Sequence, residues 1–101
     1  MWKFNHLEPS KLLTKKWKAT FSNTETGKTR TVNFGGKGYR DYTTIESDAE
    51  AEEARRAYRS RHRGDNLNDP LSPGALSWWI LWGDYRNISK NLTDYRKHFG
   101  I

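Results

Sequence analysis

The sequence predicts a single α+β domain, an antiparallel β-hairpin followed by three helices. Apolar and polar residues alternate in the segment 15–34, on both sides of a turn. Beyond a glycine-rich segment the apolar residues recur every three or four positions, which is typical of helices. The 101 residues contain no internal repeat and no low-complexity linker, so one core is expected.

The hairpin is predicted over residues 15–34. Its apolar residues share one face on either side of a turn at 23–27, and they are Trp17, Ala19, Phe21, Val32 and Phe34. Lysine and threonine side chains occupy the opposite face of the first strand. Residues 1–14 mix aromatic and polar positions without a period, so they are predicted to form an N-terminal arm ahead of a domain spanning 15–101.

Three helices are predicted over residues 47–63, 73–82 and 87–99. A residue suited to capping stands at the start of each helix or directly before it: Ser47, Ser72 and Asn87. The first and last helices carry an apolar stripe, formed by Ala51, Ala54 and Tyr58 in the first and by Ile88, Leu92, Tyr95 and Phe99 in the last. The middle helix is rich in tryptophan and ends at a glycine.

The formal net charge of +6 and a pI near 9.7 favour a polyanionic partner, above all nucleic acid. Residues 1–40 hold nine Lys or Arg against two Glu, whereas residues 46–63 hold five acids and five arginines. The excess of positive charge therefore comes from the N-terminal part of the chain and not from its arginine-rich stretch.

That stretch, "RRAYRSRHRG" at residues 55–64, has two interpretations. Acids in the first half of a helix and arginines in its second half compensate the helix dipole, which is sufficient to explain many of these charges. Arg59, Arg61 and Arg63, however, lie beyond the reach of the acids, and arginine suits phosphate recognition. The glycine-rich segment 35–39 also has two interpretations: it is either a phosphate-binding loop or simply a flexible turn.

Trp78, Trp79 and Trp82 spread over all faces of the predicted middle helix. Three indoles so placed cannot all enter one small core, so at least one is expected to contact another element, a partner protein or a nucleobase. Packing against the hairpin is the simplest of these alternatives.

Nothing in the sequence indicates catalysis, a metal site or a cofactor, and we expect the protein not to be an enzyme. The three histidines are scattered, no nucleophile motif occurs, and cysteine is absent. Four aspartates, Asp65, Asp69, Asp84 and Asp94, could form a metal-dependent nuclease site only if the fold gathered them. Without an apolar segment of membrane-spanning length or a signal-peptide pattern, we expect an intracellular protein with no membrane span.

The order of three segments, "FGGKGYRDYT", "RRAYRSRHRG" and "NDPLSPGALSWWILWG", resembles a family of small uncharacterised basic proteins encoded by large DNA viruses of algae and amoebae. The resemblance runs from about Lys15 to Trp82. It implies a viral origin, a place in the cytoplasm or nucleus of a host cell, and association with the virion and its proteins, but it implies no activity. The chain differs from the family pattern in its acidic segment 46–53.

These observations predict a non-catalytic protein that binds nucleic acid, in the first place DNA, through phosphates and largely without regard to sequence. The predicted contact residues are Lys16, Lys18, Lys28, Lys37, Arg40, Arg59, Arg61 and Arg63. The alternative is a minor structural or interaction protein of the virion that uses Trp78, Trp79 and Trp82 as its contact surface.

Overall fold

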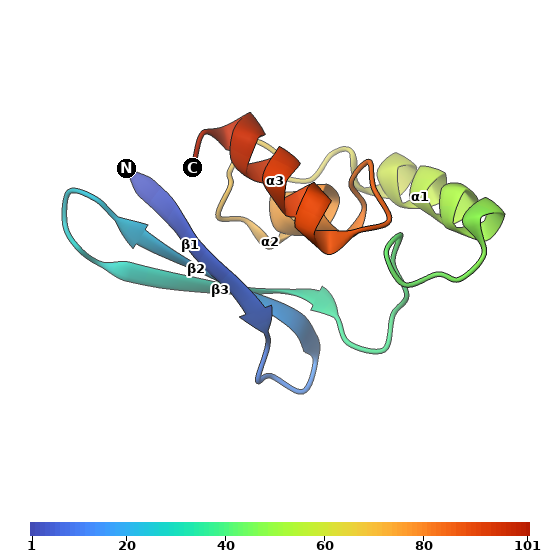
Figure 1. The fold of residues 1–101 in the computed structure, drawn as a ribbon, viewed down its shortest axis with the longest axis horizontal. Coiled ribbons are helices and arrows are strands. Elements are labelled where there is room, and N and C mark those ends of the chain that lie inside the picture. The colour runs from blue at the N-terminus through green and yellow to red at the C-terminus, as the bar shows by residue number, and fades with distance from the viewer.

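A three-stranded antiparallel sheet forms the N-terminal part of the computed structural model, which describes residues 1–101. Its strands are β1 (Trp2–Pro9), β2 (Lys15–Asn23) and β3 (Thr29–Gly36), arranged in the order β1-β2-β3. Between β2 and β3, Trp17 pairs with Phe34 and Ala19 with Val32, which confirms the predicted register of the apolar face. The sheet lies at one end of the molecule in Figure 1.

Residues 2–9 form β1, so the prediction of an arm was wrong for this segment and the predicted hairpin is two strands of three. The register shifts between Phe4 and His6, with Phe4 opposite Phe21 and Leu7 opposite Ala19. This bulge places two core-facing residues three positions apart instead of two, because it inserts one extra residue into the strand. The alternation that marks a strand in the sequence is therefore missing.

The helices are α1 (Asp48–His62), α2 (Pro73–Leu76), the π-helical turn η1 (Ser77–Leu81) and α3 (Ile88–Phe99). The predicted caps are confirmed, since the side chains of Ser47, Ser72 and Asn87 each accept a hydrogen bond from a backbone N–H three residues later. The predicted middle helix is α2 continued by η1. None of the helices has the length and apolar character needed to cross a lipid bilayer.

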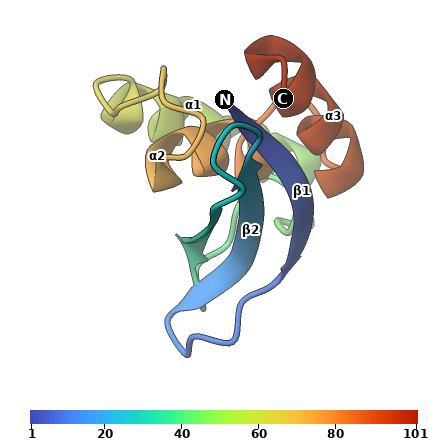
Figure 2. The same cartoon turned by 90° about the vertical axis from the view of Figure 1, so that its left-hand side faces the viewer.

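The main core lies between the sheet and the elements α2, η1 and α3. Its buried residues are Phe4, Ala19, Phe21, Val32, Phe34, Leu71, Leu76, Ile80, Leu81 and Tyr95. In the view of Figure 2 the helices gather around the upper part of the curved sheet. An α+β architecture in one small domain is therefore the observed fold.

Helix α1 lies beyond the end of the sheet, at the far end of the molecule from the turn between β2 and β3 (Figure 1). It has its own small cluster, in which Ala51 packs with Tyr42 and Ile45 and is bordered by Ala54 and Trp82. The predicted stripe on this helix is confirmed, since Ala51 and Tyr58 are buried. Beyond this cluster and the packing of Tyr58, polar contacts also hold α1 in place.

Candidate nucleic-acid interface

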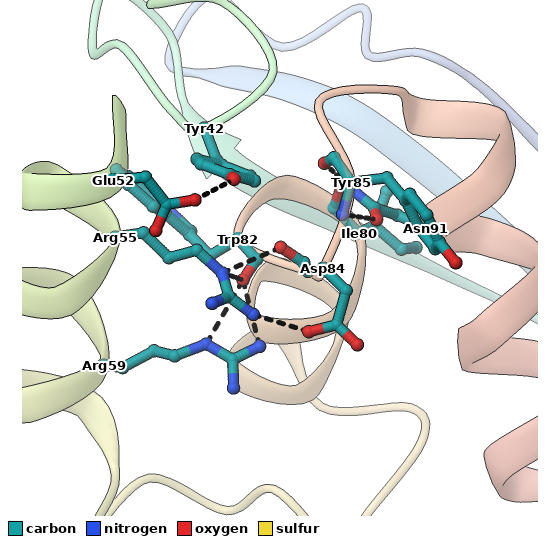
Figure 3. Close-up of polar contacts among 10 residues, drawn as sticks. Tyr42, Glu52, Arg55, Arg59, Ile80, Trp82, Asp84, Tyr85 and Asn91 are labelled. Carbon is teal, nitrogen blue, oxygen red and sulfur yellow. Dashed lines mark hydrogen bonds and ion pairs between the residues drawn. The ribbon is translucent and has the colours of Figure 1, made fainter. Parts of the chain in front are cut away.

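Two arginines of α1 hold this helix against the end of η1. The Nε atom of Arg55 donates to the carbonyl oxygens of Trp82 (3.2 Å) and Gly83 (2.8 Å), and its Nη2 atom bonds Asp84 at 2.6 Å. Arg59 donates to the same Trp82 carbonyl through Nε (3.3 Å) and Nη2 (3.1 Å). Figure 3 shows both guanidinium groups reaching this corner from α1. We call Arg55 and Arg59 the arginine clamp.

The corner that receives the clamp is itself fixed from the other side by α3. The buried Asn91 donates to the carbonyls of Ile80 (2.9 Å) and Tyr85 (2.8 Å) and accepts from the Tyr85 N–H (2.9 Å) (Figure 3). Gly83 is required here, because a Cβ at this position would lie 2.2 Å from the Trp79 carbonyl oxygen. Side chains from two helices thus satisfy carbonyls that the end of a helix leaves without partners.

Arg59 was predicted to contact phosphate, but in the structure it is engaged within the chain. Besides its bonds to Trp82, its guanidinium lies 4.5 Å from the ring centre of Trp78. Burial, reinforced by the charge of Arg55, lowers the pKa of Arg59 below its usual value. To bind a phosphate through Nε and Nη2, this arginine would have to give up its bonds to Trp82.

Two predicted lysines of the sheet are also paired. Lys16 binds Asp41 at 2.7 Å, with 17% and 3% of the two side chains exposed. Asp41 accepts further bonds from the N–H (2.8 Å) and hydroxyl (2.5 Å) of Thr43, so this carboxylate organises the loop after β3. Lys18 binds Glu8 at 2.8 Å, and its hydrogen bond and charge hold the pKa of that carboxyl below its usual value.

A cleft of about 690 Å³ separates α1 from the end of the sheet, which is within the size range of ligand pockets. One wall is a single face of α1, made of Ala54, Ala57, Tyr58, Arg61 and His62. The opposite wall comes from the ends of β2 and β3 and the loop that follows, with Lys15, Lys16, Gly35, Gly36, Tyr39, Arg40 and Asp41. The two alanines are small, so the middle of the cleft stays open.

A second hollow of about 620 Å³ adjoins the cleft and shares Lys15, Lys16 and Asp41 with it. Its other charged lining residues are Lys37 and Arg86. The two hollows together are lined by six lysines and arginines and two aspartates: Lys15, Lys16, Lys37, Arg40, Arg61 and Arg86, with Asp41 and Asp65. Positive charge is therefore concentrated at this end of the sheet.

Several of these cations are free to bind an anion. Lys15, Lys37 and Arg61 form no ion pair with any acid of the chain, whereas Arg86 pairs with Asp48. Arg40 lies 3.9 Å from Glu50, with about seven tenths of each side chain exposed, and such a pair contributes little. The available cations are thus Lys15, Lys37, Arg40 and Arg61, which we call the free cations.

Of the predicted contact residues, the structure brings Lys16, Lys37, Arg40 and Arg61 to the two hollows. Lys28 and Arg63 are exposed but line neither hollow, and Lys28 lies at the other end of β3, roughly 25 Å away at the usual rise of a strand. The sequence interpretation omitted Lys15, His62 and Arg86. Lys15 is one of the cations that give residues 1–40 their excess of positive charge, so the sequence did indicate it. No feature of the sequence indicated Arg86.

The three tryptophans of the α2–η1 segment are half-buried and contact different elements. Trp82 stacks on Tyr58 of α1 (4.5 Å between ring centres, 8° between planes), and Trp78 lies under Arg59. Trp79 stacks on His98 of α3 at 4.4 Å. The expectation that the indoles would reach beyond one core is confirmed, and each partner found here lies within the chain.

The four aspartates that a nuclease site would need lie apart. Asp84 binds the clamp, Asp69 accepts from the N–H of Leu71 at 3.0 Å, and Asp65 lies 2.9 Å from Nδ1 of His62. No group of three or more His, Cys, Asp or Glu residues is placed to hold a metal ion. The pair of His62 and Asp65 lines the cleft.

A protein family described as "Family of unknown function (DUF5754)" matches residues 5–62 of the chain, which is more than half of it. The matched segment contains most of β1, the strands β2 and β3, and α1, and with them the cleft-lining residues of both walls. No curated protein and no solved structure matches the chain.

Proposed function

The chain belongs to the family of unknown function DUF5754, and we propose that it binds nucleic acid, in the first place DNA, without catalysing a reaction. The binding surface in this proposal is the cleft with its adjoining hollow. The free cations contact phosphates there, and recognition is largely independent of sequence because phosphates carry no sequence information.

One observation supports this proposal above the others. The two adjoining hollows are lined by six lysines and arginines and only two acids, in a chain whose formal charge is +6. Asp41 and Asp84 pair with Lys16 and Arg55, whereas Lys15, Lys37 and Arg61 have no acid partner. A concave surface with an excess of one sign of charge raises the local concentration of an oppositely charged ligand.

The proposal is tested by measuring the affinity for a fluorescent DNA of mixed sequence, as a single strand and as a duplex, over a range of salt concentrations. The logarithm of the binding constant should fall linearly with the logarithm of salt, by about 0.9 per phosphate contact on a duplex and about 0.7 on a single strand. A binding constant that does not change with salt would contradict phosphate contact.

Two triple variants locate the contacts. Lys37→Gln with Arg40→Gln and Arg61→Gln removes three free cations from the hollows, whereas Lys28→Gln with Arg30→Gln and Lys97→Gln removes three exposed cations that line neither hollow. Both carry the same net charge. The first should weaken binding and make the plot of log binding constant against log salt less steep. The slope should decrease by about 0.9 for each of the three lost contacts on a duplex. An equal or larger effect of the second would place the binding surface elsewhere.

The viral origin implied by the resemblance, a location in the cytoplasm or nucleus of a host cell, and packaging in the virion belong to this proposal as well. The alternative, a structural or interaction protein of the virion, would use Trp78, Trp79 and Trp82, whose rings already pack within the chain. Pulldown from cells that express the protein, with and without nuclease, separates the two functions. Partners that disappear after nuclease treatment support nucleic-acid binding, and partners that remain support the alternative.

A further inference from the structure

Tyr39 is the tyrosine whose ring is left without a partner in the structure. Each of the other four tyrosines packs against an aromatic ring or a cation: Tyr42, Tyr58, Tyr85 and Tyr95. The side chain of Tyr39 is 77% exposed and makes no such contact. An aromatic ring of this size that is exposed to water and surrounded by free cations is a candidate contact for a ligand.

The position of this ring places it among the free cations. Tyr39 lines the cleft and stands in the chain between Lys37 and Arg40, while Arg61 forms part of the opposite wall. The ring lies against Gly36, where a Cβ would come within 2.7 Å of its Cδ2 atom. The absence of a side chain at Gly36 therefore lets the ring rest on the backbone of β3 at the mouth of the cleft.

An exposed ring flanked by cations suits one form of nucleic acid better than the other. In a duplex the faces of the bases are stacked on one another, and a protein ring reaches them only after unstacking. A single strand offers free base faces, and its phosphates follow a cationic groove while its bases stack on aromatic side chains. The combination of Tyr39 with the free cations has the composition of such a groove.

We propose that the cleft binds single-stranded nucleic acid, with one base stacked on Tyr39 and the neighbouring phosphates held by Lys37, Arg40 and Arg61. This inference rests on the proposed function and specifies the form of its ligand. The stacked base requires no particular sequence, since every base has an aromatic face.

The test compares a 12-nucleotide dT strand, a 12-nucleotide rU strand and a 12-base-pair DNA duplex by fluorescence anisotropy at one salt concentration. The wild-type protein should bind at least one of the single strands about tenfold more tightly than the duplex. Tyr39→Ala should weaken single-strand binding by about 5- to 150-fold, the range that corresponds to loss of one stacked base. It should leave duplex binding unchanged, and Tyr39→Phe should retain the affinity because the ring is kept.

Tyr85→Ala is the matched control, since Tyr85 is 45% exposed and lines neither hollow. It should leave the affinity for all three ligands unchanged. Equal affinity for duplex and single strands, with no loss in Tyr39→Ala, would overturn this inference and leave the proposed function standing. Absence of salt-dependent binding to every one of the ligands would overturn the proposed function itself.

Discussion

Two faces of α1 carry arginines that look equivalent in the sequence and behave differently in the structure. On one face, Arg55 and Arg59 donate hydrogen bonds to carbonyls at the end of η1. On the other, Arg61 forms no ion pair and lines an open cleft beside the small residues Ala54 and Ala57. The arginines of one face of α1 therefore fix the position of the helix, and the arginine of the other face is available to a ligand.

The same division separates the lysines of the sheet. Lys16 is paired with the buried Asp41, while its neighbour Lys15 has no acid partner. Whether a cation is structural or free depends on the acceptors that the fold brings to it, and these acceptors are distant in sequence. Variants on either side of this division should consequently affect different properties of the protein.

The largest effect on stability is expected from Asp41→Ala. This change leaves the largely buried Lys16 without its partner and removes the acceptor for Thr43, so the free energy of unfolding should fall by about 3 kcal/mol or more. Urea denaturation followed by tryptophan fluorescence measures it. Lys18→Met is the control, because its partner Glu8 is partly exposed and the loss there should stay below about 1 kcal/mol. A loss in Asp41→Ala as small as that expected for Lys18→Met would contradict a structural role for the Lys16–Asp41 pair.

A smaller loss is expected when the clamp is opened. Arg55→Ala leaves the Gly83 carbonyl without its partner and should cost about 2 to 3 kcal/mol, as for hydrogen bonds to charged groups. Arg59→Ala should cost less, since Arg55 still donates to Trp82. Arg61→Ala should change the free energy of unfolding by no more than about 0.5 kcal/mol, as usual for surface positions. Thermal and urea denaturation of all three variants would measure this ranking. A larger loss in Arg61→Ala than in Arg55→Ala would contradict the assignment of Arg55 as structural and Arg61 as free.

The contact between α1 and Trp82 also predicts a dependence on high pH. Burial raises the pKa of Tyr58 to about 12, whereas the phenol of an unfolded chain ionises near pH 10. The contribution of the neutral Tyr58 to the free energy of unfolding is therefore fully present below pH 10. It should fall by about 2 kcal/mol as the pH rises towards 12. Urea denaturation of Tyr58→Phe should show a shallower fall over this interval. Some fall will remain, since burial also raises the pKa of Tyr95. An unchanged profile would mean that Tyr58 is not buried as described.

The smallest energetic effect, and the most specific, is expected from filling the cleft. Ala57 lies on the exposed surface of α1 and lines the cleft, so Ala57→Leu should leave stability within about 0.5 kcal/mol of the wild type. It should weaken DNA binding by roughly tenfold, or about 1.4 kcal/mol, because the larger side chain obstructs the site. Anisotropy titration measures this change, and Ser60→Leu, also exposed on α1 but outside the cleft, is the steric control. Full affinity in Ala57→Leu would exclude the cleft as the binding surface.

The sequence predicted those parts of the molecule that depend on local patterns. The alternation from Trp17 to Phe34 and the caps at Ser47 and Asn87 are local signals, and the structure confirms the elements that they mark. The strand β1 was missed because its bulge disrupts the period of two that identifies a strand. The α+β class was predicted correctly even so, since a third strand enlarges the sheet without changing the kind of fold.

The candidate site was predicted less completely, for a different reason. Arg40 and Arg61 were named as phosphate contacts and lie at the cleft, whereas Arg59 was named on the same grounds and is engaged by Trp82, 23 residues away. Charge density in a sequence reports how many cations exist. It does not report which of them meet a carbonyl or a buried carboxylate such as that of Asp41. Those partners become visible only when the chain is folded.

The measurement that tests the central claim most directly is an NMR titration of the arginine Nε–H signals with a short DNA oligonucleotide. Each arginine has its own Nε–H group, so both sides of the comparison can be followed in one sample. Arg40 and Arg61 should shift on addition of DNA, while Arg55 and Arg59 keep the positions that their bonds to Trp82 give them. Shifts of Arg55 and Arg59 with Arg61 unchanged would contradict the account.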